Sequence, residues 1–597
     1  MKRLQPISKI LFVFVVFTLL TAMFSLNAAQ SQPARTSVNV QTGKLTFVGA
    51  SVANPVLLPQ AAAPNLSVDA RASAILDVYA PQFGAPRQDL ALVSQLQADA
   101  NRISRRYQQS YQGVTVFGAQ VVVNLTRAGG LVSMQGKLSP DLAISVSPAI
   151  SAGQAQSVAL QQVAKIYSVD ASTLAVIAPV LNIFDERLLT QSDARAALVW
   201  RVEVLSNAGA PIKQLVLVDA QTGYIALSYN QIHDNAFGDA NINVHDTAIT
   251  NANVVAQQNA GRAPGTADLA TYDTNNSGSL PGVLVCDEND ITCTEGADPD
   301  ADSAHRHADG TYNMYYDWHN RDSLNGTGFQ LKSTVHYSSG YCNAFWNSVQ
   351  MAYGDGCPSS IVIDDVVGHE LTHGVTEFTS GLIYAYQSGA INESFSDVWG
   401  EFYDITNGTA EDTPANRWRI GEEINFGTPG GGIRDMQDPT IFGDPDRYLS
   451  PLFYNGPDDS GGVHWNSGVN NKAAYLMADG ATFNGFTVTS IGVFKTAAVY
   501  YDSQTTKLGP SSQYGDLYNA LNQSCTELIG GADGITAADC TQVMNATLAT
   551  EMQLGPQVPT MPVADVCETG AAITLFSDDF ESGSANWITS AQTGGNA

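Results

Sequence analysis

The stretch Asp365-Val-Val-Gly-His-Glu-Leu-Thr-His373 contains the pattern His-Glu-x-x-His, and the other motifs are interpreted from it. On a helix, His369 and His373 lie on one face with their Cβ atoms roughly 5–6 Å apart. This spacing suits two ligands of a tetrahedral zinc ion, with Glu370 beside them to take a proton from an activated water. A helix with two ordinary histidines is the alternative, so the rest of the chain has to decide.

A hydrolytic zinc site needs a third protein ligand and one open position. Glu393, in Asn392-Glu-Ser-Phe-Ser-Asp397, follows His373 by twenty residues and can complete a set of two histidines and one glutamate. Asp397, one helical turn later, can accept the outer N–H of a ligand histidine and fix its ring. A solvated helix face is the alternative for these carboxylates, and their position after the first motif favours the metal site.

Composition narrows the class of protein. The 597 residues suffice for about three or four domains. With 28 basic and 57 acidic residues the net charge is −29, which argues against nucleic acid because its phosphates would be repelled. We expect a secreted protein that can bind calcium, with a merely solvated acidic surface as the alternative.

Residues 1–29 are typical of a secretory signal peptide. Lys2 and Arg3 form a basic start, Ile10 to Leu20 an apolar core, and Ala28-Ala29 a small-residue cleavage site. A retained membrane anchor is the alternative, but the apolar core is short for a span. We therefore expect an extracellular protein that is not held in a membrane.

The seven cysteines all lie at or after Cys286. In an oxidising compartment, pairing between sequence neighbours would give three disulfides, while other connectivities stay open. These pairs are Cys286–Cys293, Cys342–Cys357 and Cys525–Cys540, and Cys567 is left over.

Two α+β units are expected before the zinc-type motif. A flexible lead, rich in Ala, Pro and Ser, covers residues 30–66, and the first unit covers 67–141. The second unit covers 148–228, with a helix at 152–167 and a later pair of strands turning at Thr222-Gly223. Neither unit has a cysteine or a cluster of metal-ligand residues, so we expect no catalytic role for them.

After residue 236 the predicted secondary structure changes from strands to helices, and the composition then becomes Pro-rich. A β-rich part (237–360) precedes a helical part (361–552), and a Pro-rich linker follows at 553–566. Residues 567–597 include a stretch, Ile573 to Trp587, that resembles the first strand of a β-sandwich accessory domain. Because so few residues cannot form a core, we expect this domain to be truncated in the given sequence. A disordered tail with a free thiol is the alternative.

The run from His369 to Asp397 resembles the thermolysin family of neutral zinc metalloendopeptidases, and the resemblance extends over about residues 237–552. The further motifs that carry it are Tyr341-Cys-Asn-Ala-Phe-Trp346, Tyr353-Gly-Asp-Gly356, Asp438-Pro to Tyr448, Ser460-Gly-Gly-Val-His-Trp-Asn-Ser-Gly468 and Asn471-Lys-Ala-Ala-Tyr475. It implies a two-lobed enzyme, β-rich then α-helical, with one catalytic zinc in the cleft between the lobes.

The units before the enzyme part carry resemblances of their own. Residues 106–118 resemble the propeptide module of thermolysin- and fungalysin-type proteases, and residues 148–228 are similar to the PepSY module that often follows it. The resemblance implies a proenzyme whose propeptide acts as folding chaperone and inhibitor. We expect this segment, up to about Asn230, to leave by processing.

The family resemblance also implies roles for single residues. His369, His373 and Glu393 would bind zinc, and Glu370 would be the general base. His464, oriented by Asp459, and Tyr384 would stabilise the oxyanion. Arg434 would hold a substrate carbonyl, and Asn343 and Ala344 would belong to the edge strand that pairs with extended peptide. The family's pocket for a bulky apolar side chain would be lined by Val366, Ile420 and Ile433.

Calcium is implied by the same resemblance. Asp365, Asp404 and Glu422 match three carboxylates of the family's two-calcium site, with Glu423 as a helper. Arg417 and Arg419 stand where that site has acidic residues, and a guanidinium can replace the charge of one ion. We therefore expect at most one calcium there, and solvated loops in the acidic stretches 287–290 and 298–302.

Two rival functions remain at this point. An aminopeptidase would share the zinc motif but would need a site for a free amine, and the sequence has no dedicated motif for one. A non-catalytic protein that keeps the fold would be expected to have lost Glu370 or a ligand, and none is lost. We expect an endopeptidase acting on extended polypeptides, monomeric when mature.

Overall fold

The structure is a computed structural model that describes residues 34–555, apart from 64, 193, 208–209, 235–264, 291, 410–412, 425 and 428–430. The predicted signal peptide, residues 235–264, which follow the expected end of the processed segment at about Asn230, and the tail with Cys567 lie outside the described residues.

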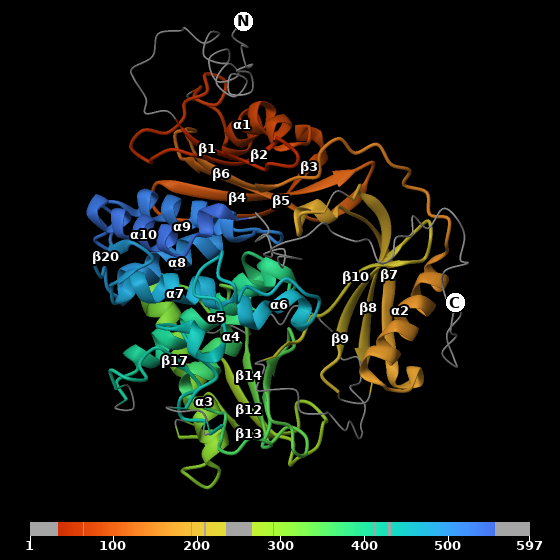
Figure 1. The fold of residues 1–597 in the computed structure, drawn as a ribbon, viewed down its shortest axis with the longest axis vertical. Coiled ribbons are helices and arrows are strands. Elements are labelled where there is room, and N and C mark those ends of the chain that lie inside the picture. The colour runs from red at the N-terminus through yellow and green to blue at the C-terminus, as the bar shows by residue number, and fades with distance from the viewer. Residues whose placement is uncertain are drawn as a thin grey trace, which may run out of the picture. The chain divides into compact units, whose positions relative to one another are not determined.

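The part of the chain before residue 231 is built on one ten-stranded sheet (Figure 1). Its strands are β1 (Arg35–Val38), β2 (Leu45–Gly49), β3 (Leu90–Gln97), β4 (Arg102–Tyr111), β5 (Val114–Thr126), β6 (Leu131–Lys137), β7 (Leu174–Phe184), β8 (Ala197–Ser206), β9 (Lys213–Asp219) and β10 (Ile225–Asn230). The main path runs β1-β2-β6-β5-β7-β8-β9-β10, with β4 also on β5 and β3 on β4. Helices α1 (Val68–Phe83) and α2 (Ala152–Tyr167) pack on its two halves, which join through the parallel pair β5–β7.

The expectation of a flexible lead over residues 30–66 is wrong for the part of it that forms strands. Strands β1 and β2 lie in this lead and pair with each other, and β2 extends the sheet by pairing with β6. The side chains of Phe47 and Val48 are buried. Burial of this short apolar run outweighs the surrounding Ala- and Pro-rich composition, which taken alone is typical of a linker.

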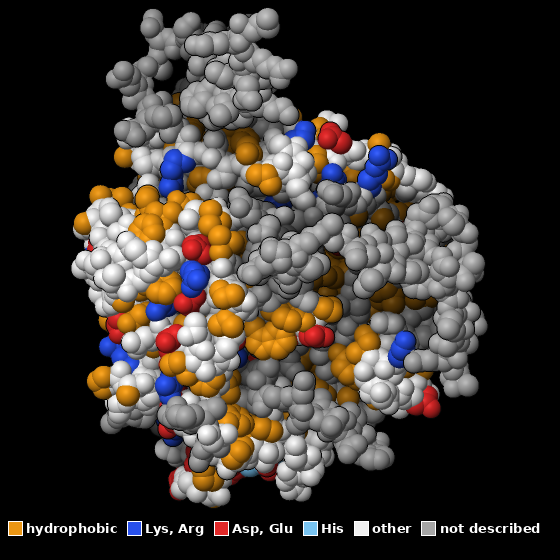
Figure 2. Space-filling model, in the orientation of Figure 1, with side chains coloured by type: hydrophobic (Ala, Val, Ile, Leu, Met, Phe, Trp, Pro, Cys, Tyr) orange, Lys and Arg blue, Asp and Glu red, His pale blue; other side chains and the backbone are white. Residues whose placement is uncertain are grey.

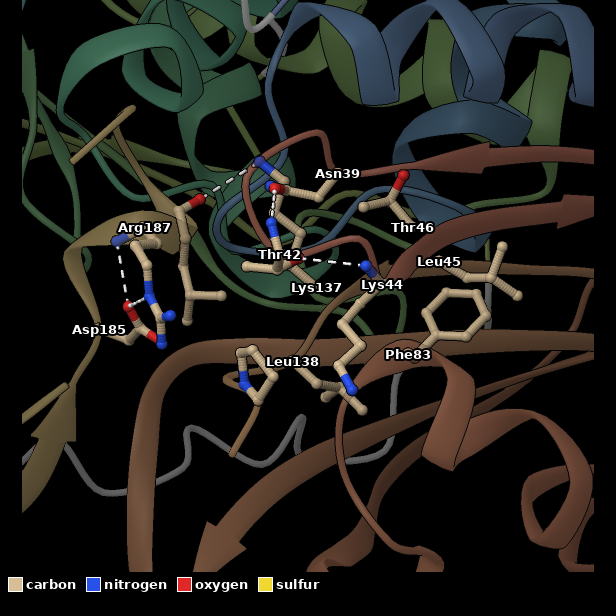
Figure 3. Close-up of a pocket in the computed structure, with 12 residues that line it drawn as sticks. Asn39, Thr42, Lys44, Leu45, Thr46, Phe83, Lys137, Leu138, Asp185 and Arg187 are labelled. Carbon is tan, nitrogen blue, oxygen red and sulfur yellow. Dashed lines mark hydrogen bonds and ion pairs between the residues drawn. The ribbon is translucent and has the colours of Figure 1, made fainter. Parts of the chain in front are cut away.

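The junction of the two sheet halves forms a small crevice lined by charged and apolar side chains (Figure 3). Arg187 donates two hydrogen bonds to Asp185 there, at 2.8 and 2.7 Å. Lys137 lines the same crevice and donates through Nζ to the carbonyl oxygens of Leu188 and Ser511 at 3.2 and 2.9 Å. The crevice is therefore tied to the helical part of the chain.

Basic side chains of the sheet also bind the helices α8 (Val493–Thr506) and α9 (Tyr514–Leu528). Arg102 is 1% exposed and pairs with Asp502 at 2.9 Å and with Glu527. Lys507 completes this group, 2.8 Å from Asp502 and 3.0 Å from Glu527. Four buried charges thus satisfy one another across the contact between the N-terminal sheet and the helices.

The next part of the chain has a six-stranded sheet of order β11-β15-β16-β14-β12-β13. Its strands are β11 (His233–Asp234), β12 (Leu269–Asp273), β13 (Val283–Asp287), β14 (Leu331–Val335), β15 (Ala344–Trp346) and β16 (Met351–Tyr353). Helix α3 (Pro299–His319) packs on β12 and β14. This β-rich lobe agrees with the predicted fold class.

Helix α3 differs from the expected acidic loop at 298–302. Asp298 caps its start by accepting a hydrogen bond from the Ala301 amide at 3.1 Å, and Pro299 occupies the first turn. Its buried face consists largely of Ala, His and Tyr side chains. The buried residues of α3 recur with the period of a helix. Because the segment has no Leu, Ile or Val, its composition alone is more typical of turns, and the helix was not predicted.

The helical lobe follows as predicted. It contains α4 (Asp364–Phe378), α5 (Tyr386–Thr406), α6 (Asp459–Asn466), α7 (Gly468–Ala478), α8, α9 and α10 (Ala537–Ala549), with the two-stranded pairs β17 (Arg419–Ile420) with β18 (Arg434–Asp435) and β19 (Ala481–Phe483) with β20 (Phe486–Val488). One hydrophobic core runs through both lobes, and α4 and α5 lie within it. The three expected disulfides, Cys286–Cys293, Cys342–Cys357 and Cys525–Cys540, are all present.

Across the described surface, acidic and basic side chains are interspersed on the face seen in Figure 2, among scattered hydrophobic ones. Within residues 34–555, no helix combines the length and the apolarity that a bilayer span requires.

The partly buried side chain of His336 connects two elements of the β-rich lobe. Its Nδ1 lies 2.8 Å from Asp355 and its Nε2 lies 3.2 Å from Asp298, the capping residue of α3. Partial burial opposes protonation, but the two carboxylates outweigh it and raise the pKa of His336. The form of His336 that hydrogen-bonds to both carboxylates is therefore the imidazolium, since only this form donates from both ring nitrogens.

This link predicts a pH-dependent contribution to stability. A raised folded-state pKa stabilises the fold below the ordinary histidine pKa, and the stabilisation is lost as the pH rises through the folded value. We expect His336→Gln to lower the melting temperature at pH 5.5 and to leave it nearly unchanged at pH 9, in calcium- and zinc-saturated buffer. An equal decrease at both pH values would contradict the charged link.

Candidate metal centre

Two consecutive helices, α4 and α5, bring the predicted zinc ligands together because they cross at very close range. A Cβ atom added to Gly400 would lie 2.4 Å from the carbonyl oxygen of Asp365, and one added to Gly368 would lie 3.0 Å from the Cα of Gly400. Only glycine permits this backbone contact. The crossing places residues 392–397 of α5 beside the histidine face of α4.

His369, His373 and Glu393 form a compact group at this crossing. The Nε2 atoms of the two histidines are 3.0 Å apart, and the carboxylate oxygens of Glu393 lie 3.5 Å from His369 Nε2 and 3.4 Å from His373 Nε2. All three side chains are fully buried. Two imidazole nitrogens and a carboxylate that converge in this way are the donor set of a hydrolytic zinc ion, so the residues present fit that metal.

The outer ring nitrogens of both histidines are occupied. His369 Nδ1 lies 2.9 Å from Asp397 Oδ1, and His373 Nδ1 lies 2.9 Å from Asn392 Oδ1 and 3.1 Å from Ser396 Oγ. Donation of Nδ1–H to these oxygens leaves the Nε2 lone pairs for a metal. Burial and the neighbouring histidines hold the pKa of His373 well below its usual range, which keeps its ring neutral.

Asp397 is the centre of a second layer behind the metal ligands. Arg434 on β18 donates to it from Nε at 2.8 Å and from a terminal nitrogen at 2.6 Å, and Asn471 donates at 2.7 Å. Burial opposes ionisation of Asp397, but Arg434 and His369 hold its pKa below the usual value. The carboxylate is thus ionised and fixes the His369 ring. Arg434, predicted to hold substrate, lies behind the metal ligand His369.

A second group of polar side chains faces Glu393 from α6 and from the loop before α5. His464 Nε2 lies 3.1 Å from the Tyr384 hydroxyl and 3.5 Å from Glu393. Its Nδ1 lies 2.6 Å from Asp459, whose other oxygen accepts from the His464 amide at 2.8 Å. The Tyr384 hydroxyl also donates to Glu393.

The chain can form the Asp459–His464 pair because the intervening turn is left-handed. Ser460, Gly461 and Gly462 have φ values of 51°, 94° and 78° inside α6. A Cβ added to Gly461 would lie 2.5 Å from the Tyr386 ring, and one added to Gly462 would lie 2.8 Å from the Tyr454 ring. The two glycines therefore let the Asp459 carboxylate fold back onto the histidine.

The predicted substrate strand borders this group. Asn343 directly precedes β15, which begins at Ala344, and β15 packs on α4. Glu370 directly follows His369 in α4, and its side chain is fully buried. The predicted catalytic, metal and strand residues thus come from α4, α5, α6, β15 and the loop before α5.

The candidate calcium ligands are less closely grouped. Among the described residues, four groups of His, Cys, Asp or Glu have ligand atoms within 4.8 Å of one another, and Asp365, Asp404 and Glu422 do not form one of them. Burial and the adjacent Asp364 raise the pKa of Asp365, whose oxygens accept from the amides of Val366 and Gly421. A cation beside Asp365 would favour its ionised form.

The arginines in the same region form their own ion pairs. Arg417 lies 3.3 Å from Asp479, and Arg419 lies 3.0 Å from Asp435. Neither partner is one of the proposed calcium ligands Asp365, Asp404 and Glu422. The replacement of one ion's charge by a guanidinium stays a prediction.

Four polar residues of the site have no role predicted from the sequence, although each lies in a motif that carries the family resemblance. Asn392 and Ser396 lie one position before and three positions after Glu393. Asn471 and Asp444 belong to the motifs at 471–475 and 438–448, far from α4 and α5 in the sequence. Asp444 is buried beside Arg434 and Asp397, and burial raises its pKa well above the usual value.

Three family models match the chain. Residues 238–377 match the thermolysin metallopeptidase catalytic domain, 380–547 match the thermolysin metallopeptidase alpha-helical domain, and 105–138 match the fungalysin/thermolysin propeptide motif. The first two matches meet between α4 and α5, so each contributes part of the histidine and glutamate group.

Curated relatives match most of the chain. Bacillolysin of Brevibacillus brevis is 36% identical over 439 residues, which cover 71% of this chain and 78% of that protein. Thermolysin of Alicyclobacillus acidocaldarius is 35% identical over 482 residues, covering 75% and 84%. A zinc metalloproteinase of Renibacterium salmoninarum is 35% identical, covering 80% and 86%. Among solved structures, the precursor of protealysin from Serratia proteamaculans is 30% identical, with a TM-score of 0.41, covering 49% of this chain and 89% of that one.

Proposed function

We propose, on the premise that this chain belongs to the thermolysin family of zinc metallopeptidases, that it is a secreted endopeptidase whose reaction is carried out at the group formed by His369, His373, Glu393 and Glu370. One observation carries the proposal. The two Nε2 atoms and the Glu393 carboxylate converge in a buried site while Asp397 and Asn392 occupy the outer ring nitrogens.

Glu370 is the proposed general base. A zinc ion bound by the three ligands supplies Lewis-acid activation of a water molecule and of the scissile carbonyl. Glu370 takes the proton that the water loses as it attacks, and later passes it to the departing amine. Glu370 is fully buried in the proenzyme.

Tyr384 and His464 are the proposed donors to the carbonyl oxygen as it gains negative charge. Their functional atoms are 3.1 Å apart and lie on the same side of Glu393. Asp459 lies against His464 Nδ1 and would stabilise the imidazolium form, whose second N–H, at Nε2, faces the Tyr384 hydroxyl. Removal of one oxyanion donor costs ~10²–10³ in rate.

Extended polypeptides are the proposed substrates, cut within the chain. The support is β15, whose edge can take up another strand by antiparallel pairing beside α4. Val366, Ile420 and Ile433 remain the proposed lining of an apolar pocket. An aminopeptidase would need a free amine on its substrate, and an endopeptidase would not.

The enzyme is made as a proenzyme with a propeptide motif. We propose that residues 67–141 and 148–228 are its two modules, that 237–360 and 361–552 are the two lobes of the enzyme, and that the mature form is a monomer. Calcium binding belongs to the family, and we propose Asp365, Asp404 and Glu422 as ligands. Secretion is supported by the basic and apolar start of the chain and by three disulfides.

Metal removal tests this proposal. Mature protein should cleave casein and a peptide blocked at its N-terminus, and a zinc chelator should lower the rate by at least about a hundredfold, since the three ligands act only through the metal. One equivalent of zinc, checked by metal analysis, should restore the rate. Undiminished cleavage by metal-free protein would overturn the metal mechanism, and a requirement for a free amino terminus would overturn the endopeptidase assignment.

A further inference from the structure

A series of buried polar side chains runs from the metal centre into the helical lobe. Asn471 on α7 donates from Nδ2 to Asp397 Oδ2 at 2.7 Å, and its Oδ1 accepts from the Ser394 hydroxyl on α5 at 2.5 Å. Ser394 Oγ accepts from Asn470 Nδ2 at 2.8 Å, and Asn470 Oδ1 accepts from the Tyr500 hydroxyl on α8 at 2.9 Å. Four hydrogen bonds in series thus end on the carboxylate behind the metal ligands. The name relay is used below for the four residues Tyr500, Asn470, Ser394 and Asn471.

All four hydrogen bonds of the relay point toward Asp397. An ionised carboxylate only accepts, so Asn471 presents its NH₂ group to Asp397 and its oxygen to Ser394. Ser394 has one proton and gives it to that oxygen, so it accepts from the NH₂ group of Asn470. The oxygen of Asn470 is left to accept from Tyr500. The charge of Asp397 therefore selects one arrangement of donors throughout the relay, and hydrogen bonds aligned in series strengthen one another.

The relay is enclosed by the protein. Its four side chains are at most 1% exposed. Buried polar groups cost free energy unless they are hydrogen-bonded, and apolar side chains would fill the same space without this requirement. Because Tyr500 at the far end is fully buried, the relay does not deliver a proton to solvent there. These observations favour a role in holding Asp397 in position.

The far end of the relay is fixed by aromatic packing on α5. The centroid of the Tyr500 ring lies 5.4 Å from that of Phe395 and 6.5 Å from that of Phe402. Both phenylalanines are fully buried. The Tyr500 hydroxyl is thus held in one place, from which the relay passes through α7 and α5 to Asp397.

The near end of the relay completes the hydrogen bonding of Asp397. Oδ1 lies 2.9 Å from His369 Nδ1 and accepts from a terminal nitrogen of Arg434 at 2.6 Å. Oδ2 accepts from Arg434 Nε at 2.8 Å and from Asn471 at 2.7 Å. Without Asn471, Oδ2 would keep only the guanidinium, and the carboxylate would be free to turn toward it. The orientation of the His369 ring therefore depends on how firmly Asn471 holds Asp397.

We propose that the relay positions the zinc ligand His369, with Asn471 as the residue that directly holds Asp397. The inference rests on the proposed function and deepens it, because it assigns part of the zinc affinity to side chains that touch neither the metal nor the substrate. Cutting the relay at any point then weakens zinc binding.

Zinc binding by the full chain tests the relay without turnover. The parent carries Glu370→Gln, so that the chain does not cleave itself, and the zinc affinity is measured by competition with a chromophoric chelator. Asn471→Ala should bind zinc about 10–100-fold more weakly than the parent, the usual effect of losing an outer partner of a metal ligand. Tyr500→Phe removes only the last hydroxyl and should bind zinc about threefold or more weakly, since the aligned series is shortened.

The matched control is Tyr514→Phe. Tyr514 is also fully buried, and its hydroxyl donates to the carbonyl oxygen of Asn466, outside the relay. The zinc affinity of this variant should stay within about twofold of the parent. An equal loss in Tyr514→Phe would overturn the proposal. Parent-like zinc affinity in Tyr500→Phe would overturn it too, whatever denaturant unfolding shows for the metal-free protein.

A double-mutant cycle tests whether Tyr500 acts through Asn471. In the Asn471→Ala background the relay is already cut, so Tyr500→Phe should cause no further loss of zinc affinity. Losses that multiply in the double variant would contradict the relay. Ser394→Ala cuts the relay in its middle and should weaken zinc binding by a factor between those of the two single variants, which keeps the test open if Tyr500→Phe does not fold.

A spectroscopic measurement follows the hydrogen bond itself. In zinc-loaded protein with isotope-labelled histidine, the NMR resonance of the His369 Nδ1 proton should shift in Tyr500→Phe and stay in place in Tyr514→Phe. An unmoved resonance in Tyr500→Phe would overturn the relay. Failure of the proposed function is distinguishable, because it would appear as a parent that binds no zinc or as retained activity in metal-free mature enzyme.

Discussion

Replacement of Glu370 by glutamine is expected to reduce kcat of the mature enzyme by about 10²–10⁴-fold, with little change in KM or in zinc content. The amide keeps the size of the side chain but cannot take up the proton of the attacking water, and general-base catalysis is worth about this factor. Glu370 lies on the buried face of α4 next to the ligand His369. The measurement is steady-state cleavage of a blocked peptide, with zinc determined in the same samples.

The matched control is Glu377→Gln on the same helix. Glu377 is exposed and accepts a hydrogen bond from the Trp346 indole at 2.9 Å, which a glutamine oxygen can also accept. Activity of this variant should stay within about twofold of wild type, as is usual for a surface substitution. Wild-type turnover in Glu370→Gln would rule out the proposed base.

The Arg102→Met proenzyme, studied with Glu370→Gln to prevent processing, is expected to lose about 3–5 kcal/mol of its free energy of unfolding. Arg102 joins β4 to Asp502 of α8 and Glu527 of α9. Its loss leaves two buried carboxylates with Lys507 as the remaining cation of the group. Denaturant unfolding followed by circular dichroism measures the difference.

Arg195→Met serves as the control, because Arg195 is an exposed arginine of the same propeptide sheet region. Its effect should stay within about 0.5 kcal/mol. Equal stabilities of the two variants would show that the buried charge group does not hold the proenzyme together. Burial opposes ionisation of Asp502, but Arg102 and Lys507 lower its pKa, so its contribution is present above the ordinary carboxyl pKa and declines as the pH falls below it.

The site was predictable from sequence to the extent that its residues lie in short, ordered motifs. Helical spacing predicts that His369 lies beside His373 on one helix and Glu393 beside Asp397 on the next. The crossing of the two helices at Gly368 and Gly400, which brings the two pairs together, is seen only in the structure. His464 and Asp459 are five positions apart, and their pairing follows from the left-handed glycine turn between them. The role of Arg434 beside Asp397, in contrast, depends on how β18 packs, which no local pattern expresses.

Other parts of the structure depend on contacts far apart in the sequence. Strand β2 becomes a sheet strand only because β6, more than eighty residues later, pairs with it. His233 lies near Tyr384 because the propeptide sheet ends beside β15. Helix α3 was hidden by its composition, although Asp298 and Pro299 at its start are a helix-start signal that could have been used.

The position of all three zinc ligands on the adjacent helices α4 and α5 has a consequence for folding thermodynamics. Glu393 follows His369 by only 24 positions, so the metal closes a short loop rather than fastening distant segments, and the entropy of chain closure that it saves is small. The crossing at Gly368 and Gly400 already brings the helices together through backbone contact. The apo protein should therefore keep its tertiary structure, and the affinity for zinc should reflect coordination chemistry with little energy spent on reassembling the fold.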